Sequence, residues 1–116
     1  MFREQATAPR QEDFEPPTCA LRVQHKREWT AVILRGELDL FTTTELIYWV
    51  RIELAREKPV LVELAGLDFA DLSGARALAG LGREYEAEAR VELHGARGQV
   101  RRMLQRFDPA ATKRAE

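Results

Sequence analysis

Residues 60–79 read VLVELAGLDFADLSGARALA, and the architecture of the chain is best inferred from this stretch. The run Val60–Ala65 is apolar at nearly every position and predicts a short buried strand. After a short turn come Asp71-Leu72-Ser73-Gly74. The next segment, Ala75–Ala87, repeats apolar residues at helical spacing, at Leu78, Leu81 and Tyr85. The stretch therefore predicts a strand, a turn and a helix, with Ser73 at the helix N-terminus.

Two further strands are predicted upstream of this stretch. Residues Cys19, Leu21 and Val23 alternate with polar neighbours, which indicates a strand with one buried face. After the polar stretch His25–Glu28, the run WTAVIL (Trp29–Leu34) is apolar at nearly every position, as expected for a strand covered on both faces. We expect the two strands to form an antiparallel hairpin whose second strand lies inside the sheet.

A helix is predicted between this hairpin and the strand that begins at Val60. Thr42 and Glu45 have the spacing of a capping box, in which each side chain satisfies a free amide at a helix start. Because Pro59 limits how far the helix can run, we expect it to end near Glu57 or Lys58. Its buried stripe is formed by Leu46, Val50 and Leu54.

The remaining elements complete an α/β fold. One more strand is predicted at Val91–Leu93, and Val100, Leu104 and Phe107 predict a short amphipathic helix before Pro109. Strands separated by single helices imply parallel crossovers beside the antiparallel hairpin. We therefore predict a single domain at residues 19–108, with a mixed sheet of four to five strands and three to four helices packed on it. Residues 1–18 are expected to form a flexible arm and residues 109–116 a frayed tail.

The composition restricts the classes of function. The chain has 116 residues, enough for one domain, and its 45% hydrophobic and 32% charged residues are ordinary for a soluble globular protein. The formal net charge is -1, so no basic field favours nucleic acid or an anionic membrane. Cys19 is the only cysteine, and it has no metal-ligand spacing with either histidine. We therefore expect that the protein binds no metal, nucleic acid or membrane. Because the N-terminus has no apolar core of signal-peptide type, we also expect it to be cytoplasmic.

Ser73 has two interpretations from its position alone. As an N-cap, its hydroxyl oxygen accepts a hydrogen bond from a helix amide and stabilises the helix by about 1 kcal/mol, which is the commoner use of serine there. As a phosphorylation site, it would carry a phosphate that the free amides and the positive end of the helix can hold. Phosphorylation would add about -1.5 to -2 charges close to Asp71 and repel a partner docked there through acidic or apolar groups.

Two motifs in this order resemble the STAS domain, which is shared by sulfate transporters and anti-sigma factor antagonists. The first is Gly36-Glu37-Leu38-Asp39, which ends a strand and precedes a Thr-led helix, and the second is Asp71-Leu72-Ser73-Gly74. A looser match is the closing helix, where the family's valine followed by basic and leucine positions corresponds to Val100-Arg101-Arg102-Met103-Leu104. The resemblance covers roughly residues 19–108 and is closest to the stand-alone anti-anti-sigma factors.

The resemblance implies a partner switch in which this chain is a substrate and not an enzyme. In the family, the hydroxyl residue directly before the glycine is phosphorylated by an anti-sigma factor that is also a serine kinase of the histidine-kinase-like ATPase type. The match falls on Ser73. The unphosphorylated protein would bind this kinase and free a sigma factor, the phosphorylated protein would let go, and no cofactor is implied. The partner-binding surface would comprise Glu37, Asp39, Thr42, Asp71, Leu72, Gly74 and Ala75.

The chain departs from the family pattern at two positions. Leu72 stands where the family usually has serine, so a second hydroxyl is replaced by an apolar group that must be buried or contact a partner. Ala75 stands where the family usually has leucine, which shrinks an apolar contact in the first turn of the helix. Both changes bear on which kinase can dock.

Other functions and assemblies are compatible with the sequence. A STAS protein that is never phosphorylated would serve as a constitutive interaction subunit, for example of a transporter ATPase complex. A small hydrolase needs a nucleophile with a base, but no triad or dyad motif spacing is found among Ser73, Cys19, His25 and His94. A homodimer is left open, because the helix after Thr42 carries extra apolar surface at Tyr48, Trp49 and Ile52.

Two groups of residues are given structural interpretations. Gly80 and Gly82 lie inside a helical pattern and match no nucleotide-binding fingerprint, so they are expected to permit close helix packing. The last helix carries a row of arginines that is expected to be a solvated face, at Arg97, Arg101, Arg102 and Arg106.

Overall fold

Four β-strands form one mixed sheet in the computed structural model, which describes residues 19–84 and 90–107. The order in the sheet is β1-β2-β3-β4. The first pair is antiparallel and the next two pairs are parallel, so the predicted α/β fold with an opening hairpin is confirmed. The strands are β1 (Cys19–His25), β2 (Thr30–Leu38), β3 (Val60–Ala70) and β4 (Val91–His94).

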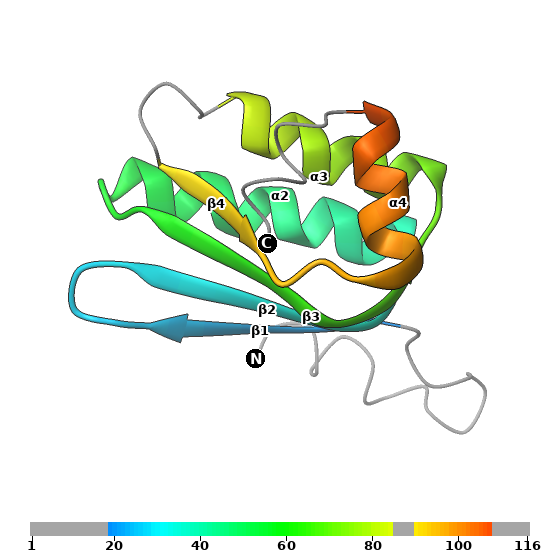
Figure 1. Ribbon diagram of the computed structural model, residues 1–116. Coiled ribbons are helices and arrows are strands. Elements are labelled where there is room, and N and C mark those ends of the chain that lie inside the picture. Colours follow the sequence, from blue (N-terminus) through cyan, green and yellow to red (C-terminus); the bar gives the residue numbers. More distant parts are fainter. Residues whose placement is uncertain (1–18, 85–89, 108–116) are drawn as a thin grey trace.

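The described helices lie together on one face of this sheet (Figure 1). They are α2 (Leu40–Ala55), α3 (Leu72–Glu84) and α4 (Gly98–Phe107). Each helix turns an apolar stripe toward the strands, and burying a large aliphatic side chain in this way contributes about 1.5–3 kcal/mol. The largest fully buried side chains of this core include Leu34, Leu64 and Leu93 from the strands and Leu46, Leu78 and Leu104 from the helices.

β2 lies inside the sheet, as predicted, but the described helices cover only one of its faces. Val32 and Leu34 belong to the core under the helices and are fully buried. On the opposite face, Ile33 is half-buried and Arg35 is exposed. Within the predicted run, coverage of this second face is therefore partial, because Ala31, which alternates with Val32, is buried there and Ile33 is half-buried.

β3 is longer than predicted. It continues past the expected end at Ala65 to Ala70, because β2 offers partners as far as Leu38, which lies opposite Ala70. The register between the two strands shifts twice, between Ile33 and Arg35 and between Gly36 and Glu37. Such irregularities interrupt the alternation of buried and exposed residues, so the second half of β3 does not look like a strand in the sequence.

The helix limits also differ from the predicted ones. α2 ends at Ala55, before the predicted end near Glu57 or Lys58, and Glu57 has a positive φ of 64°. α3 begins at Leu72, ahead of the predicted segment. The expected arm, the expected tail and the helix end near Ala87 lie outside the described residues. No helix in the described part of the chain is both long enough and apolar enough to cross a membrane.

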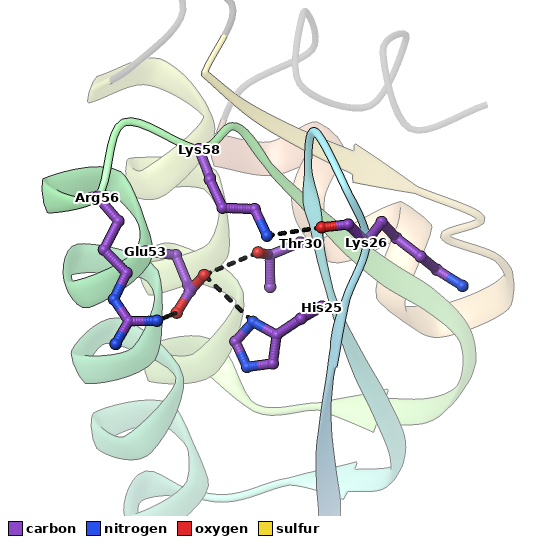
Figure 2. Close-up of polar contacts among 6 residues, drawn as sticks. All are labelled: His25, Lys26, Thr30, Glu53, Arg56 and Lys58. Atoms are coloured by element: carbon purple, nitrogen blue, oxygen red, sulfur yellow. Dashed lines mark hydrogen bonds and ion pairs between the residues drawn. The ribbon is translucent and has the colours of Figure 1, made fainter.

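A buried carboxylate lies where β2 begins, at the edge of the sheet away from the starts of α2 and α3 (Figure 2). Glu53, near the end of α2, is fully buried, and its Oε1 accepts a 2.8 Å hydrogen bond from the Thr30 hydroxyl. Nδ1 of His25 lies 3.5 Å from the same oxygen. The other oxygen, Oε2, has no hydrogen-bond donor among the described residues, and the Arg56 guanidinium lies 3.8 Å from it. This cluster ties the end of α2 to the opening hairpin.

Candidate functional site

Two helix N-termini lie side by side at one edge of the sheet. β2 and β3 run parallel and end together, with Leu38 opposite Ala70. Because each strand is followed at once by a helix, Asp39 and Asp71 occupy corresponding positions directly after that pair. The two motifs of the sequence, which are far apart along the chain, are thereby brought together at this edge.

Asp39 is the N-cap of α2. Its Oδ1 accepts a 2.7 Å hydrogen bond from the amide of Thr42, and its carbonyl oxygen accepts hydrogen bonds from the amide and the hydroxyl of Thr43. The prediction that the helix starts at a capping box of Thr42 and Glu45 is therefore wrong. Thr42 lies inside the first turn and is fully buried. An aspartate directly after the strand satisfies the first free amides, so the helix already begins at Leu40.

Asp71 makes the corresponding cap at α3 and also holds Ser73. Its Oδ1 accepts a 2.7 Å hydrogen bond from the amide of Gly74 and a 2.9 Å hydrogen bond from the Ser73 hydroxyl. The amide of Ala75 donates to the carbonyl oxygen of Asp71 over 2.9 Å. The interpretation of Ser73 as the N-cap is therefore wrong, because Asp71 fills that position. Ser73 lies in the first turn of α3 and is exposed.

The Ser73 hydroxyl is exposed and has a fixed direction. Its hydrogen is directed to the Asp71 carboxylate, which leaves the oxygen lone pairs for an incoming electrophile. The positive end of the α3 macrodipole favours an anion such as phosphate at this place. Within residues 19–84 and 90–107, no group of three or more His, Cys, Asp and Glu side chains could hold a metal ion.

The predicted partner-binding residues divide into an exposed and a buried group. At the surface, Glu37, Asp71 and Leu72 are exposed, and Asp39 is half-buried beside them. The second group is buried and lies beneath this surface. The buried group consists of Thr42, Gly74 and Ala75.

The two departures from the family pattern have different surroundings. Leu72 is 52% exposed, so of the two alternatives for this apolar group, burial is excluded. Ala75 is fully buried, so its small side chain alters the packing beneath α3 and not the exposed surface. Leu72 is therefore the departure that a docking partner would meet directly.

Three exposed apolar residues on the segments next to Asp39 and Asp71 were not predicted from the sequence. Leu40 and Phe41 open α2 and are 69% and 59% exposed, and Phe69, opposite Glu37 at the end of β3, is 43% exposed. Polar and acidic side chains are usual in the first turn of a helix, so the apolar pair directly after Asp39 is the signal that could have revealed this surface. These three residues and Leu72 are called the apolar rim.

The capping role of Asp71 predicts different effects for two substitutions. Asp71→Ala is expected to lower the free energy of unfolding by about 1 kcal/mol, because the amide of Gly74 loses its acceptor. Asp71→Asn is expected to change it by only a few tenths of a kcal/mol, because asparagine caps a helix as well as aspartate does. Urea unfolding followed by far-UV circular dichroism measures both. An equal loss in the two variants would show that the charge of Asp71, and not its cap, stabilises the fold.

Two glycines of α3 are expected to respond with opposite signs when each is replaced by alanine. A Cβ at Gly74 would lie 2.9 Å from Cδ2 of Leu38, so Gly74→Ala should destabilise the protein by about 1–2 kcal/mol. A Cβ at Gly80 would meet nothing within 4 Å, so the expectation of close helix packing there is wrong. Gly80→Ala should stabilise the protein by about 0.5–1 kcal/mol through helix propensity. Thermal unfolding of the two variants tests the pair, and a change of the same sign in both would contradict it.

Comparison with known proteins gives one family and several solved structures of similar fold, among them the two that follow. Residues 21–110 match the family model described as "Mlab, STAS domain". The structure of the anti-sigma factor antagonist SpoIIAA in its unphosphorylated form superposes with a TM-score of 0.68 at 24% identity, covering 84% of this chain and 86% of that chain. An anti-sigma factor antagonist from Mycobacterium paratuberculosis superposes with a TM-score of 0.65 at 20% identity, covering 85% of each chain. A search of curated proteins finds no match. At these identities, the likeness concerns the fold.

Proposed function

Because this chain belongs to the STAS domain family, we propose that it is an anti-sigma factor antagonist that binds an anti-sigma factor and releases it when Ser73 is phosphorylated. The observation that carries the proposal is the exposed Ser73 hydroxyl, held by Asp71 at the start of α3, the same end of the sheet from which α2 begins. SpoIIAA is an anti-sigma factor antagonist whose solved structure is of its unphosphorylated form, which supports regulation by phosphorylation here.

The apolar rim supplies the affinity for a partner. Its four side chains are between 43% and 69% exposed, and covering large apolar side chains contributes up to about 1.5–3 kcal/mol each. Glu37 and Asp71 are exposed at the same end of the sheet. The surface therefore suits an anti-sigma factor that presents an apolar patch, which a phosphate on Ser73 would be costly to bury against.

Phosphorylation of Ser73 would reverse this binding through charge. The phosphate would carry about -1.5 to -2 charges. It would be attached to an oxygen that lies 2.9 Å from the Asp71 carboxylate. Two like charges about 4 Å apart repel by about 4 kcal/mol at an effective dielectric constant near 20, whereas the helix dipole contributes only about 0.3–1 kcal/mol. In the free protein, water screens this repulsion. In a complex that excludes water, the repulsion and the desolvation of the phosphate favour release.

In this function the chain is the substrate of its partner and has no catalytic role of its own. The partner would be an anti-sigma factor with serine kinase activity of the histidine-kinase-like ATPase type, and both would act in the cytoplasm. Docking of this chain would free the sigma factor. A homodimer through the outer face of α2 stays a separate prediction. There, Tyr48 is exposed and Trp49 and Ile52 are half-buried.

A second function is favoured by Leu72. This residue replaces a hydroxyl of the family motif by an exposed apolar group, which adds to a permanent contact and contributes nothing to phosphorylation. The chain would then be an interaction subunit that is never phosphorylated, for example in a transporter ATPase complex. The two functions share the docking surface and differ in whether Ser73 is ever modified.

Intact-mass analysis combined with capture of partners separates the two functions. The tagged wild-type chain, Ser73→Ala and Ser73→Glu would be purified from the source cells during growth and under stress. Thr44→Ala serves as the matched control, because Thr44 is also an exposed hydroxyl near a helix start. We expect a mass gain of one phosphate in the wild type and in Thr44→Ala, and none in Ser73→Ala. We also expect an anti-sigma factor to be retained by Ser73→Ala and lost by Ser73→Glu.

Two results would contradict the first function. One is the absence of any phosphate under every condition, together with a partner that Ser73→Glu retains, which is the result expected of the permanent subunit. The other is a phosphate that persists in Ser73→Ala, which would place the modification elsewhere in the chain.

A further inference from the structure

The outer edge of β3 is only partly covered by β4. β4 pairs with β3 from Val60 to Glu63, whereas β3 continues to Ala70. Backbone amides and carbonyls of a buried strand need partners, and the second half of β3 has no strand beside it on this side among the described residues. The start of α4 supplies partners instead. Nε of Arg97 donates to the carbonyl oxygen of Ala65 over 2.6 Å, so this arginine does more than form a solvated face.

At Ala70, the last residue of β3, the side chain of Gln99 makes the hydrogen bonds that a neighbouring strand would otherwise make. The amide of Ala70 donates to Oε1 of Gln99 over 2.9 Å, and Nε2 of Gln99 donates back to the carbonyl oxygen of Ala70 over 2.9 Å. The side-chain carboxamide thus pairs with both backbone groups of one residue, as a peptide group of an adjacent strand would. On its other side, Ala70 lies opposite Leu38 of β2. The strand end is therefore fixed from both sides.

The residue after this double hydrogen bond is Asp71. The carboxylate of Asp71 accepts from both Gly74 and Ser73, and these two contacts set the direction of the Ser73 hydroxyl. The position of the Asp71 carboxylate depends on the backbone from which it extends, and that backbone is continuous with Ala70. A shift of Ala70 would therefore move the cap and the hydroxyl together.

We propose that Gln99 is a positioning residue for the Ser73 turn. Its carboxamide holds the end of β3 so that the Asp71 carboxylate caps α3 and directs the Ser73 hydroxyl. The role assigned to this turn rests on the proposed function. Gln99 itself does not touch the group that would be transferred, and it acts through Ala70 and Asp71. A side chain of α4 thereby helps to fix the geometry of the turn at the start of α3, which is far from it in the sequence.

The test uses the full, unphosphorylated chain and nuclear magnetic resonance. Gln99→Met keeps a side chain of similar length and removes both hydrogen bonds, and Gln99→Ala also removes the packing. Gln105→Met is the matched control, because Gln105 is an exposed glutamine of the same helix. We expect hydrogen exchange at the Ala70 amide to become at least about tenfold faster in both Gln99 variants. The amide proton of Gly74 should move upfield in both, because its bond to the carboxylate weakens, and Gln105→Met should change neither.

The Gly74 resonance distinguishes positioning from a local structural role. If Gln99 only covered the strand edge, exchange at Ala70 would rise while the Gly74 amide kept its wild-type shift in Gln99→Met, and the proposal would be overturned. An equal shift in Gln105→Met would overturn it as well. The measurement needs neither partner nor phosphate. Failure of Ser73 phosphorylation in the intact-mass experiment would therefore leave this result standing, and the two failures are distinguishable.

Discussion

Replacing Thr30 with valine is expected to lower the free energy of unfolding by about 2–3 kcal/mol, because Glu53 loses the hydroxyl that donates to its buried carboxylate. Valine has nearly the shape of threonine, so the effect reports the hydrogen bond and not a cavity. Oε2 of Glu53 has no hydrogen-bond donor among the described residues, and the Arg56 guanidinium lies 3.8 Å from it (Figure 2). His25 lies farther from the same carboxylate, at 3.5 Å, and its side chain is 51% exposed. Urea unfolding followed by circular dichroism measures the loss.

A second substitution at Glu53 should reverse the loss. In the Thr30→Val background, Glu53→Met removes the buried carboxylate, and replacing a buried charge by an apolar side chain of similar volume is often neutral or stabilising. The double variant is therefore expected to recover most of the lost free energy, with a coupling of at least about 1 kcal/mol between the two sites. Thr44→Val is the control, because the Thr44 hydroxyl is exposed and donates only to the carbonyl of Leu40. Simple additivity, or an equal loss in Thr44→Val, would refute the explanation.

Removing two side chains of the apolar rim, one from α2 and one from α3, is expected to weaken binding of the anti-sigma factor by about 100-fold or more. Phe41→Ala and Leu72→Ala each delete an exposed apolar side chain, and such truncations at the centre of an interface commonly cost 1–2 kcal/mol or more each. Because both side chains are exposed in the free protein, the fold should keep its free energy of unfolding within about 0.5 kcal/mol. Surface plasmon resonance against the partner retained by Ser73→Ala measures the affinities.

Tyr48→Ala is the control for this prediction. Tyr48 is also a large exposed residue of α2 but lies farther along the helix from the Asp39 end than Phe41. It is expected to leave the affinity within a factor of about three, because residues outside the centre of an interface contribute little. If Tyr48→Ala weakens binding as much as Phe41→Ala does, the partner contacts the outer face of α2, and the apolar rim is not the docking surface.

Much of the site's location could be predicted from local patterns. The apolar run at Val60 followed by the helical spacing after Ala75 was enough to place Ser73 near a helix start. Which residue caps each helix could not be inferred as safely, because Thr42, Ser73, Asp39 and Asp71 are all good caps and lie close together in each motif. The choice depends on where the preceding strand ends. β3 ends at Ala70 only because β2 pairs with it that far.

The contacts that complete the site join residues that are distant along the chain. Gln99 forms hydrogen bonds with Ala70, and the two residues are too far apart in the sequence for a local pattern to reveal the contact. Leu38 of β2 limits the space at Gly74 of α3. The burial of Glu53 is of the same kind. A charged residue that borders the apolar stripe of a helix is usually exposed to solvent. Here the hairpin of β1 and β2 covers Glu53, and the Thr30 hydroxyl donates a hydrogen bond to its carboxylate.

Local order alone determined the succession of strands and helices and the place of Ser73 in that succession, because the spacing of apolar residues reflects the geometry of each element by itself. Tertiary structure decided that Asp39 and Asp71 lie at one edge, that Leu40, Phe41, Phe69 and Leu72 stay exposed around them, and that Gln99 reaches Ala70. These properties depend on the register between strands and on which side of each helix the sheet covers. Both are settled only when the elements pack against each other, since many arrangements satisfy the same local pattern and the packed core selects one.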